Sequence, residues 1–350
     1  MHLASPMRTI WLVVSTVLVG CAAGDPGPVG ADPEEVATEG GKADGAIAAV
    51  PDIRCAGAPD AGKAGDFRHF TSGLISRLGS PKHRGLDLVT SAGSATQTLE
   101  GWISYTFADK ALEDEDVDVF ACRAGQWRRI GAARTDDEGH FALGLAGADR
   151  LPIGMRDLFV SVVGDRTGTG FLGYVAPDGN PLIVSDVDGT LTSSENAFLE
   201  TITLGIEPGE RAGAPSAYDA AIAKRYQLVY VTARGNQYTT ATRDWLEHKG
   251  FPRGPVRLSP SFVTLPGGDT IDYKTRTLEA LSAAGLEIAA GIGNRASDVT
   301  AYTQSGLPAD RIFIEMPDYA SEVQPLLDRH AAIGFATYDE LRTTYLAKLP

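Results

Sequence analysis

Two aspartates stand two residues apart in the segment VSDVDGTLT (184–192), where an apolar run gives way to a loop. Asp186 and Asp188 could divide a phosphoryl-transfer reaction between them. One carboxylate attacks phosphorus and forms a covalent intermediate, and the other gives a proton to the leaving group and later takes one from water. Gly189 permits the tight turn that such a loop requires.

A carboxylate that attacks an anionic phosphate needs compensating positive charge and hydrogen-bond donors. Asp298 and Asn294 offer oxygen ligands for a hard cation, Lys274 offers an ammonium group, and Thr232 offers a hydroxyl. Arg276 is an alternative source of the positive charge, and a threonine at the position of Thr232 is also compatible with a simple turn. The sequence therefore contains every group that the reaction needs.

The overall charge excludes some classes of protein. The chain has 350 residues, 43% hydrophobic and 22% charged, with a formal net charge of -14. A protein that grips nucleic acid through its global charge would be basic, so nucleic acid is excluded as a partner of this kind. An anionic substrate must be held by a local cluster, for which Arg234, Arg253 and Arg295 are candidates; solvated surface charge is the alternative for all three.

Apolar strands alternate with helical segments after Pro181. The expected strands are Leu182–Asp186, Gln227–Val231, Ile288–Ile292 and Arg311–Ile314, and the expected helices are Tyr238–His248, Lys274–Ala284 and Ala296–Gln304. This alternation predicts an α/β doubly wound parallel sheet, in which ligands bind at the carboxyl ends of the strands. The conspicuous polar residues of the first three strands fall at those ends.

The preceding region follows a different pattern. A short apolar-periodic helix is expected at 67–78, followed by six strands of period two at 98–107, 117–122, 127–134, 140–145, 158–163 and 170–175. Strands without intervening helices predict an all-β sandwich. No paired catalytic groups occur in this region.

The amino terminus resembles an export signal. An apolar run of about ten residues from Ile10 to Val19 is too short to span a bilayer as a helix. The ending Leu18-Val19-Gly20-Cys21 resembles the lipobox of bacterial lipoproteins, which implies a lipidated Cys21 and membrane attachment; an ordinary cleaved signal is the alternative. Ala22 after the cysteine favours the outer membrane, with the periplasm or cell surface as the expected location.

Two cysteines remain beyond Cys21. Because exported chains meet an oxidising compartment, Cys55 and Cys122 are expected to form one disulfide, with two unpaired thiols as the alternative.

Four motifs in order resemble those of the haloacid dehalogenase superfamily: VSDVDGTLT, VTAR at 231–234, Lys274, and GNRASD at 293–298. The flanking runs FPRGPVRLSP (251–260) and GNRASDVTAYTQSGLPADRIF (293–313) are similar to the catalytic domain of the lipins, the magnesium-dependent phosphatidate phosphatases. The resemblance covers about 140 residues and implies a phosphatase with a minimal cap.

The resemblance implies roles for individual residues. Asp186 would be the nucleophile, Asp188 the general acid and base, Thr232 a ligand of the phosphoryl oxygens, and Lys274 the neutralising cation. Magnesium would be held by the Asp186 side chain, the Asp188 main-chain carbonyl and Asp298, with Asn294 nearby.

The predicted organisation is a signal peptide at 1–20, a flexible tether at 21–62, a short helix plus β-sandwich at 63–178 and a phosphatase domain resembling the haloacid dehalogenase superfamily at 179–350. The spacing of the motifs leaves little room for a large cap, which favours a phosphate displayed on a lipid surface. The expected activity is magnesium-dependent hydrolysis of phosphatidate or a related phospholipid monoester. Hydrolysis of soluble nucleotides or sugar phosphates, and phosphatidate binding without turnover, are the alternatives, and the oligomeric state stays open.

Overall fold

The computed structural model describes residues 50–106, 108–193, 207–261 and 267–350. The predicted signal peptide, Cys21 and most of the predicted tether lie outside these residues. The described residues all belong to one compact unit, which contains both an all-β and an α/β region.

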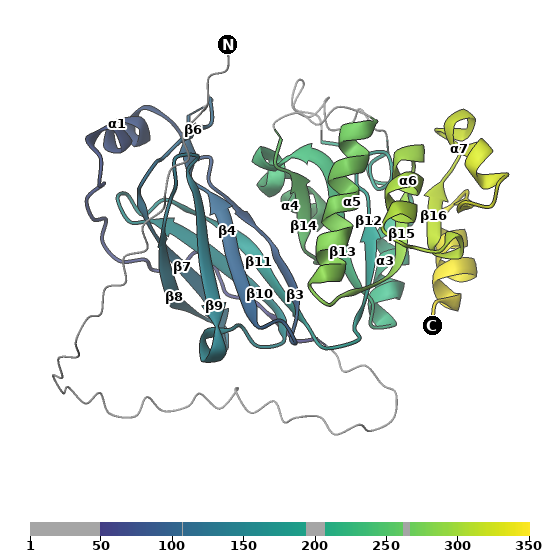
Figure 1. The fold of residues 1–350 in the computed structure, drawn as a ribbon, viewed down its shortest axis with the longest axis horizontal. Helices are drawn as coiled ribbons and strands as arrows, with labels where there is room; N and C mark the ends of the chain where they lie inside the picture. Colours follow the sequence, from purple (N-terminus) through teal and green to yellow (C-terminus); the bar gives the residue numbers. More distant parts are fainter. Residues whose placement is uncertain (1–49, 107, 194–206, 262–266) are drawn as a thin grey trace, which may run out of the picture. The chain divides into compact units, whose positions relative to one another are not determined.

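A six-stranded parallel sheet forms the centre of the α/β region (Figure 1). Its strand order is β14-β13-β12-β15-β16-β17, with every neighbouring pair parallel. The strands are β12 (Pro181–Ser185), β13 (Gln227–Gly235), β14 (Val256–Ser259), β15 (Glu287–Gly293), β16 (Ile312–Glu315) and β17 (Ile333–Phe335). The doubly wound sheet predicted from the alternation is thus confirmed.

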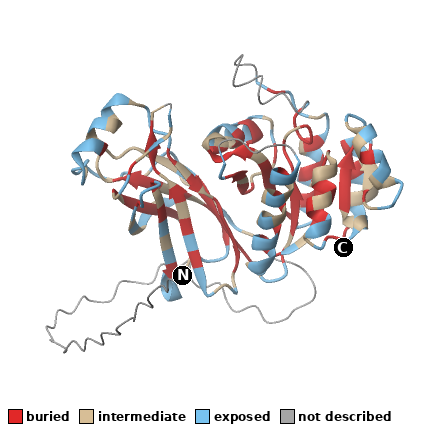
Figure 2. Ribbon diagram, turned by 45° about the horizontal axis from the view of Figure 1, so that its top comes forward, coloured by how far each residue is buried: buried red, intermediate tan, exposed pale blue. Residues whose placement is uncertain are grey.

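Helices pack against both faces of this sheet because alternate strand residues point to opposite sides. The helices are α3 (Ala214–Ala223), α4 (Thr239–His248), α5 (Gly268–Ala283), α6 (Ala296–Gln304), α7 (Ala320–Leu327) and the short α8 (Tyr338–Glu340). One core joins α3 and α4 to residues such as Ile183 and Tyr230, and the other joins α5 and α6 to residues such as Val184 and Val231. Figure 2 shows buried strands between helices whose outer faces are exposed.

The all-β region is a sandwich that precedes the α/β region. One sheet has the order β3-β11-β10-β7-β8 with β1 paired to β10, and the other has the order β2-β4-β9. Its strands are β1 (Asp52–Ile53), β2 (Arg84–Leu86), β3 (Leu88–Ser91), β4 (Thr96–Trp102), β7 (Asp116–Arg123), β8 (Gln126–Arg134), β9 (His140–Ala146), β10 (Gly154–Val162) and β11 (Gly168–Ala176). Leu99 and Phe141 of one sheet and Val119 and Leu158 of the other share one core.

Several predicted elements differ from those observed. The strand expected at 98–107 is divided into β4 and a two-stranded ribbon of β5 (Ser104–Tyr105) and β6 (Lys110–Ala111). The division falls at Ile103, whose N–H donates to the Gly139 carbonyl opposite it while its own carbonyl accepts from Leu112. The helix expected at 67–78 begins at Phe70 as α1 (Phe70–Leu78). No helix in the described part of the chain is both long and apolar enough to cross a bilayer.

The sandwich and the parallel sheet are joined through a buried carboxylate. Asp87, between β2 and β3, accepts hydrogen bonds from the N–H groups of Leu172 and Val256, both at 2.7 Å. The Arg243 guanidinium on α4 donates to both oxygens of the same carboxylate, at 2.9 and 3.2 Å. Because the acceptor is buried and charged, these bonds fix β14 against the sandwich more strongly than neutral bonds would.

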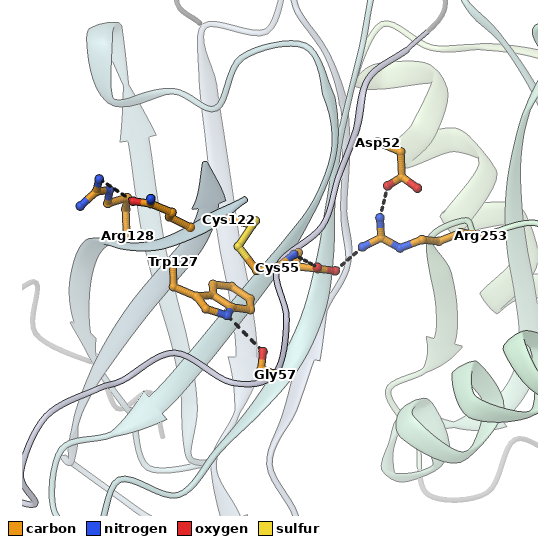
Figure 3. Close-up of a disulfide and its surroundings, with 9 residues drawn as sticks. Asp52, Cys55, Gly57, Cys122, Trp127, Arg128 and Arg253 are labelled. Atoms are coloured by element: carbon orange, nitrogen blue, oxygen red, sulfur yellow. Dashed lines mark hydrogen bonds and ion pairs between the residues drawn. A yellow bond between two sulfur atoms is a disulfide. The ribbon is translucent and has the colours of Figure 1, made fainter. Parts of the chain in front are cut away.

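A disulfide joins Cys55 to Cys122 of β7 (Figure 3). Asp52 and Ile53 pair with β10, and the Cys55 N–H donates to Asp157 at 2.8 Å. The structure therefore corrects the carboxyl end of the predicted tether: the chain already belongs to the sandwich at Asp52, not only after residue 62. The sequence held one indication of this boundary: Cys55, expected to form a disulfide with Cys122 of the sandwich, lies within the predicted tether.

Removing this disulfide is expected to lower the free energy of unfolding by about 3–4 kcal/mol, since it closes a long loop in the unfolded chain. The bridged residues are 67 positions apart. Urea unfolding of wild type and a Cys55→Ser/Cys122→Ala variant measures the difference. A reductant should lower the free energy of unfolding of the wild type to that of the variant and should not change that of the variant. Equal free energies of unfolding of the two proteins without reductant would contradict the prediction.

A buried histidine gives the sandwich a pH-dependent stability. Burial lowers the pKa of His83 from 6.5 to about 4, against an opposing effect of Asp165, and Nε2 lies 2.9 Å from Thr167 Oγ1. The unfolded chain therefore binds a proton between pH 6.5 and 4 that the folded chain does not. The free energy of unfolding should fall by up to ~3 kcal/mol as pH drops through this window. Urea unfolding at pH 7.5, 5.5 and 4.5 should show a smaller loss for His83→Gln, and an identical loss would contradict the assignment.

Candidate active site

Asp186 is the first residue after β12 and lies at the carboxyl end of the sheet. Its N–H donates to the Ile292 carbonyl on β15 at 2.9 Å, and its side chain is 7% exposed. Apolar residues on both faces make β12 a central strand, so the end of this strand places the carboxylate in the middle of the edge where parallel sheets bind ligands.

Lys274 lies between two buried carboxylates. Its Nζ donates to Asp186 Oδ1 at 2.6 Å and to Asp298 Oδ1 at 2.5 Å. The other oxygen of Asp298 accepts from the N–H groups of Asn294 and Arg295, both at 3.0 Å, at the start of α6. Lys274 is inside α5 rather than at its start, because the helix begins six residues earlier than predicted.

Close backbone approach is required at Gly293. A Cβ atom at this position would come within 2.5 Å of the Asp298 carboxylate, so only glycine permits β15 to end against that side chain.

Burial and charge act on these groups in opposite directions. Burial raises the pKa of Asp186 to about 7, although the neighbouring Lys274 ammonium lowers it. The two carboxylates raise the pKa of Lys274 above its usual value despite its burial, so the ammonium stays charged. The pKa of Asp186 is therefore raised although an ammonium bonds to it, and a titratable group perturbed in this way is a candidate for a functional residue.

Asp188 is held by the end of β13. Thr232 Oγ1 donates to Asp188 Oδ2 at 3.0 Å, and Arg234 forms a bidentate pair with the same carboxylate, with Nη2 to Oδ1 at 2.6 Å and Nε to Oδ2 at 2.9 Å. The Arg234 side chain is 3% exposed. Arg234, predicted as a substrate contact, is thus placed on the second aspartate, which it orients.

Thr190 connects the two aspartate-bearing loops and has no role in the sequence-based assignment. Its Oγ1 lies 3.0 Å from Asp186 Oδ2 and 3.2 Å from Asn294 Oδ1. A hydroxyl has one proton and can donate to only one of these oxygens, while the buried Asn294 Nδ2 has no hydrogen-bond partner among the described residues. Turning the amide would let Nδ2 donate to Thr190 and leave Oδ1 available as a ligand.

The donor set suits a hard divalent cation. Asp186, Asp298 and Asn294 supply the oxygen atoms that Mg²⁺ prefers. The site contains three carboxylates, of Asp186, Asp188 and Asp298, and two cations, Lys274 and Arg234. One negative charge therefore has no cation among these residues, and a bound metal ion would balance it. Within the described ranges no group of three His, Cys, Asp or Glu side chains already has the arrangement of a metal site, since Lys274 occupies the space between two of the carboxylates.

The remaining predicted arginines are committed to other partners. Arg253 pairs with Asp52 (Figure 3). It also pairs with Asp157. It precedes β14 and so lies at the amino end of that strand, away from the edge that carries Asp186; its predicted role as a substrate contact is therefore corrected. Arg295 pairs with Glu322 at 2.9 Å and stacks over Tyr319 at 4.0 Å from the ring centroid.

Gly189 has φ of 72°, and its N–H donates to Thr192 Oγ1 at 2.8 Å. Its carbonyl accepts from Arg211 at 2.9 Å. The loop between the two aspartates and the next element is therefore held by an arginine that sequence reasoning missed. Arg211 stands outside all four motifs, so no local pattern could have indicated it, whereas Thr190 belongs to the first motif and could have been included.

Comparison with known proteins gives two regional matches. The family described as "PITM 1-3, beta-sandwich domain" matches residues 81–175, and the family described as "PITM 1-3, LNS2 domain" matches residues 183–315. These ranges correspond to the sandwich and to the part of the α/β region that carries the aspartates.

Individual proteins are also similar to this chain. The chain is 28% identical over 236 residues to Protein retinal degeneration B of Drosophila melanogaster, covering 66% of this chain and 18% of that protein. It is 27% identical over 257 residues to human Membrane-associated phosphatidylinositol transfer protein 3, covering 71% and 25%. It is 30% identical over 175 residues to mouse Phosphatidate phosphatase LPIN3, covering 46% and 20%.

The chain spans a quarter or less of the length of these relatives. The chain is therefore similar, in this order, to the β-sandwich and LNS2 domains of the PITM 1-3 proteins, and its α/β region resembles the lipin catalytic domain.

Proposed function

We propose that the α/β region hydrolyses phosphomonoesters, with Asp186 as the nucleophile and Asp188 as the general acid and base. The observation that carries this proposal is the convergence of Asp186, Asp188, Thr232, Lys274 and Asp298 at the carboxyl end of the sheet. These residues come from four separate segments of the chain, and no structural purpose requires a buried lysine between two carboxylates beside a second, arginine-clamped aspartate.

The reaction would proceed in two displacements. An Asp186 oxygen attacks phosphorus and the phosphorus–oxygen bond of the ester breaks. Asp188, which first takes a proton from solvent, gives this proton to the departing alkoxide. Water then attacks the phosphorus of the aspartyl phosphate, Asp188 takes a proton from this water, and inorganic phosphate leaves with Asp186 regenerated. Thr232 and Arg234 hold Asp188 in place for both transfers.

Mg²⁺ is the proposed cofactor, held by Asp186, Asp298, Asn294 and the Asp188 main-chain carbonyl. When bound, it would balance the negative charge shared by the nucleophile and the phosphate. Mg²⁺ is expected to raise the melting temperature of the wild type reversibly, because a ligand that binds only the folded state stabilises it. EDTA should undo this effect.

A phospholipid monoester such as phosphatidate is the proposed substrate. Two considerations support it: the motifs leave little sequence for an enclosing cap, and the relatives are named as a phosphatidate phosphatase and a phosphatidylinositol transfer protein. A lipid anchor at Cys21 would raise the local concentration of such a substrate. Detergent-dependent extraction of the wild type from membranes, lost in Cys21→Ser, is the expected result for the anchor.

The activity test compares phosphatidate in mixed micelles with a nucleotide monophosphate and a sugar phosphate, each with Mg²⁺ and with EDTA. We expect Mg²⁺-dependent phosphate release, fastest from phosphatidate. Faster release from the soluble esters would support the soluble-substrate alternative. Phosphatidate binding without release from any ester would identify a binding module and overturn the proposed hydrolysis.

A further inference from the structure

A pocket of about 790 Å³ lies where the sandwich meets β14 and α5. The sandwich lines it with Leu86, Val89 and Trp102, and the α/β region lines it with Leu258, Ala280 and Leu281. Its volume is within the range of small-molecule sites. The buried carboxylate of Asp87 joins these two walls as described above, so the pocket is part of one compact unit.

A cation without an ion-pair partner lines this pocket. Arg257 on β14 has no carboxylate within ion-pair distance among the described residues, and burial lowers the pKa of its guanidinium. Asp87, the acid with the largest effect on the pKa of Arg257, already accepts hydrogen bonds from Arg243 and two N–H groups. Glu100, which also lines the pocket, is close to another side chain: its Oε1 lies 3.4 Å from Nε2 of His140.

The second unsatisfied group is a phenol. Tyr273 lines the same pocket, and its buried hydroxyl has no hydrogen-bond partner among the described residues. Burial raises its pKa, so it is a neutral donor. A guanidinium has only donors, so an anion is the partner that would satisfy Arg257. The Tyr273 hydroxyl is closed off from the pocket in this structure and would donate to the same anion only after its side chain turns toward it.

Two exposed acidic residues also line the pocket, and they do not prevent an anion from binding to Arg257. Asp269 and Asp272 line it from the exposed first turns of α5, where water screens their charge. Arg276, one turn further along, is also exposed and donates to the Asp272 carbonyl. The rim is thus mixed in charge, whereas the less exposed donors Arg257 and Tyr273 are both complementary to an anion.

We propose that this pocket binds an amphipathic anion, with its charged group on Arg257 and its aliphatic chain against the apolar wall. Arg257 is not part of the aspartate cluster: it pairs in register with Val231, and β13 lies between β14 and β12, which puts these two strands about 10 Å apart. Tyr273 borders the cluster, since it directly precedes Lys274. The proposal does not depend on hydrolysis, and it gives the sandwich a role as one wall of a ligand site.

The test uses the full chain carrying Cys21→Ser, so that no acyl anchor is attached, and calorimetric titration below the micelle concentration. The probes are dodecanoate and dodecylphosphonate. The control ligands are acetate and methylphosphonate, which lack the long chain, and dodecanol, which lacks the charge. Both twelve-carbon anions should bind and change the fluorescence of Trp102, a change that Trp102→Phe removes. The three control ligands should bind at least about tenfold more weakly.

Variants separate the charge from the cavity. Arg257→Gln should weaken the binding of both long-chain anions about tenfold, and Ala280→Trp should weaken it by filling the pocket from an exposed helix position. Arg276→Gln, which removes an exposed arginine at the rim of the same pocket, should bind as the wild type does. Arg257→Gln should keep its melting temperature, because it removes a charge that no carboxylate balances.

The affinities of the two probes distinguish the source of the anion. Tighter binding of dodecanoate would indicate a fatty acid, and tighter binding of dodecylphosphonate would indicate a phospholipid monoester. Either result supports the site. Unchanged affinity in Arg257→Gln, or equal binding of acetate and dodecanoate, would overturn the proposal. Repeating the titration with Asp186→Asn keeps the outcome independent of hydrolysis, since binding in this pocket should be unaltered by that substitution.

Discussion

Replacing Asp186 with asparagine is expected to reduce phosphate release by about 10⁴-fold or more, because a neutral amide cannot take the place of the attacking carboxylate. The fold should survive. Burial already raises the pKa of Asp186 to about 7, so a neutral side chain of the same shape removes a charge that the folded protein accommodates poorly. Steady-state release of inorganic phosphate from phosphatidate measures the effect, with thermal melting as a check on folding.

The matched control is Asp219→Asn, which neutralises an exposed acid on α3. It should retain the activity of the wild type. Asp188→Asn should also lose most turnover, since proton transfer fails in both displacements, while the oxygen of the new amide could still accept bonds from Thr232 and Arg234. An Asp186→Asn protein that melts normally and turns over phosphatidate at the wild-type rate would remove Asp186 from the reaction.

Lys274→Met is expected to lower the free energy of unfolding by about 3–5 kcal/mol, the largest effect on stability that the structure predicts. The lysine is 6% exposed and its ammonium is the common partner of Asp186 and Asp298. Its loss would leave two buried carboxylates repelling each other without a compensating charge. Urea unfolding at pH 7.5 measures the change.

A second substitution shows whether charge is the cause. The double variant Lys274→Met/Asp298→Asn should lose less free energy of unfolding than the sum of the losses of the two single variants. The reason is that the double variant no longer buries two unpaired carboxylates. Arg276→Met, on the exposed side of the same helix, should change stability by no more than about 0.5 kcal/mol. Additive losses in the double variant would show that Lys274 acts through packing instead.

Local pattern was sufficient for much of the fold. The apolar run before Asp186 is buried on both faces and ends at the carboxylate, so β12 and its position at the functional edge followed from hydrophobicity alone. α6 has the predicted bounds, Ala296–Gln304. The prediction of one strand at 98–107 was wrong because the Ile103 carbonyl accepts from Leu112 while its N–H donates to Gly139, and a period of two cannot reveal that one residue bonds to two different segments.

Elements with weak patterns were missed for a related reason. β14 has only four residues, and β2 and β3 are short segments around Asp87. Their strand conformation is stabilised by pairing and by the hydrogen bonds that converge on the Asp87 carboxylate, not by intrinsic propensity. The pocket at this junction, with Arg257 and Tyr273, was therefore invisible before the segments were brought together.

The sequence by itself determined which carboxylates could do chemistry, because motif order and strand ends are local properties: Asp186, Asp188 and Asp298 lie where they were expected. Only the tertiary structure decided the partner of each cation. Lys274 meets carboxylates 88 and 24 positions away, Arg234 is committed to Asp188, and Arg253 is committed to acids of the sandwich. Charge pairing depends on distance in space and on burial, and residue order along the chain specifies neither.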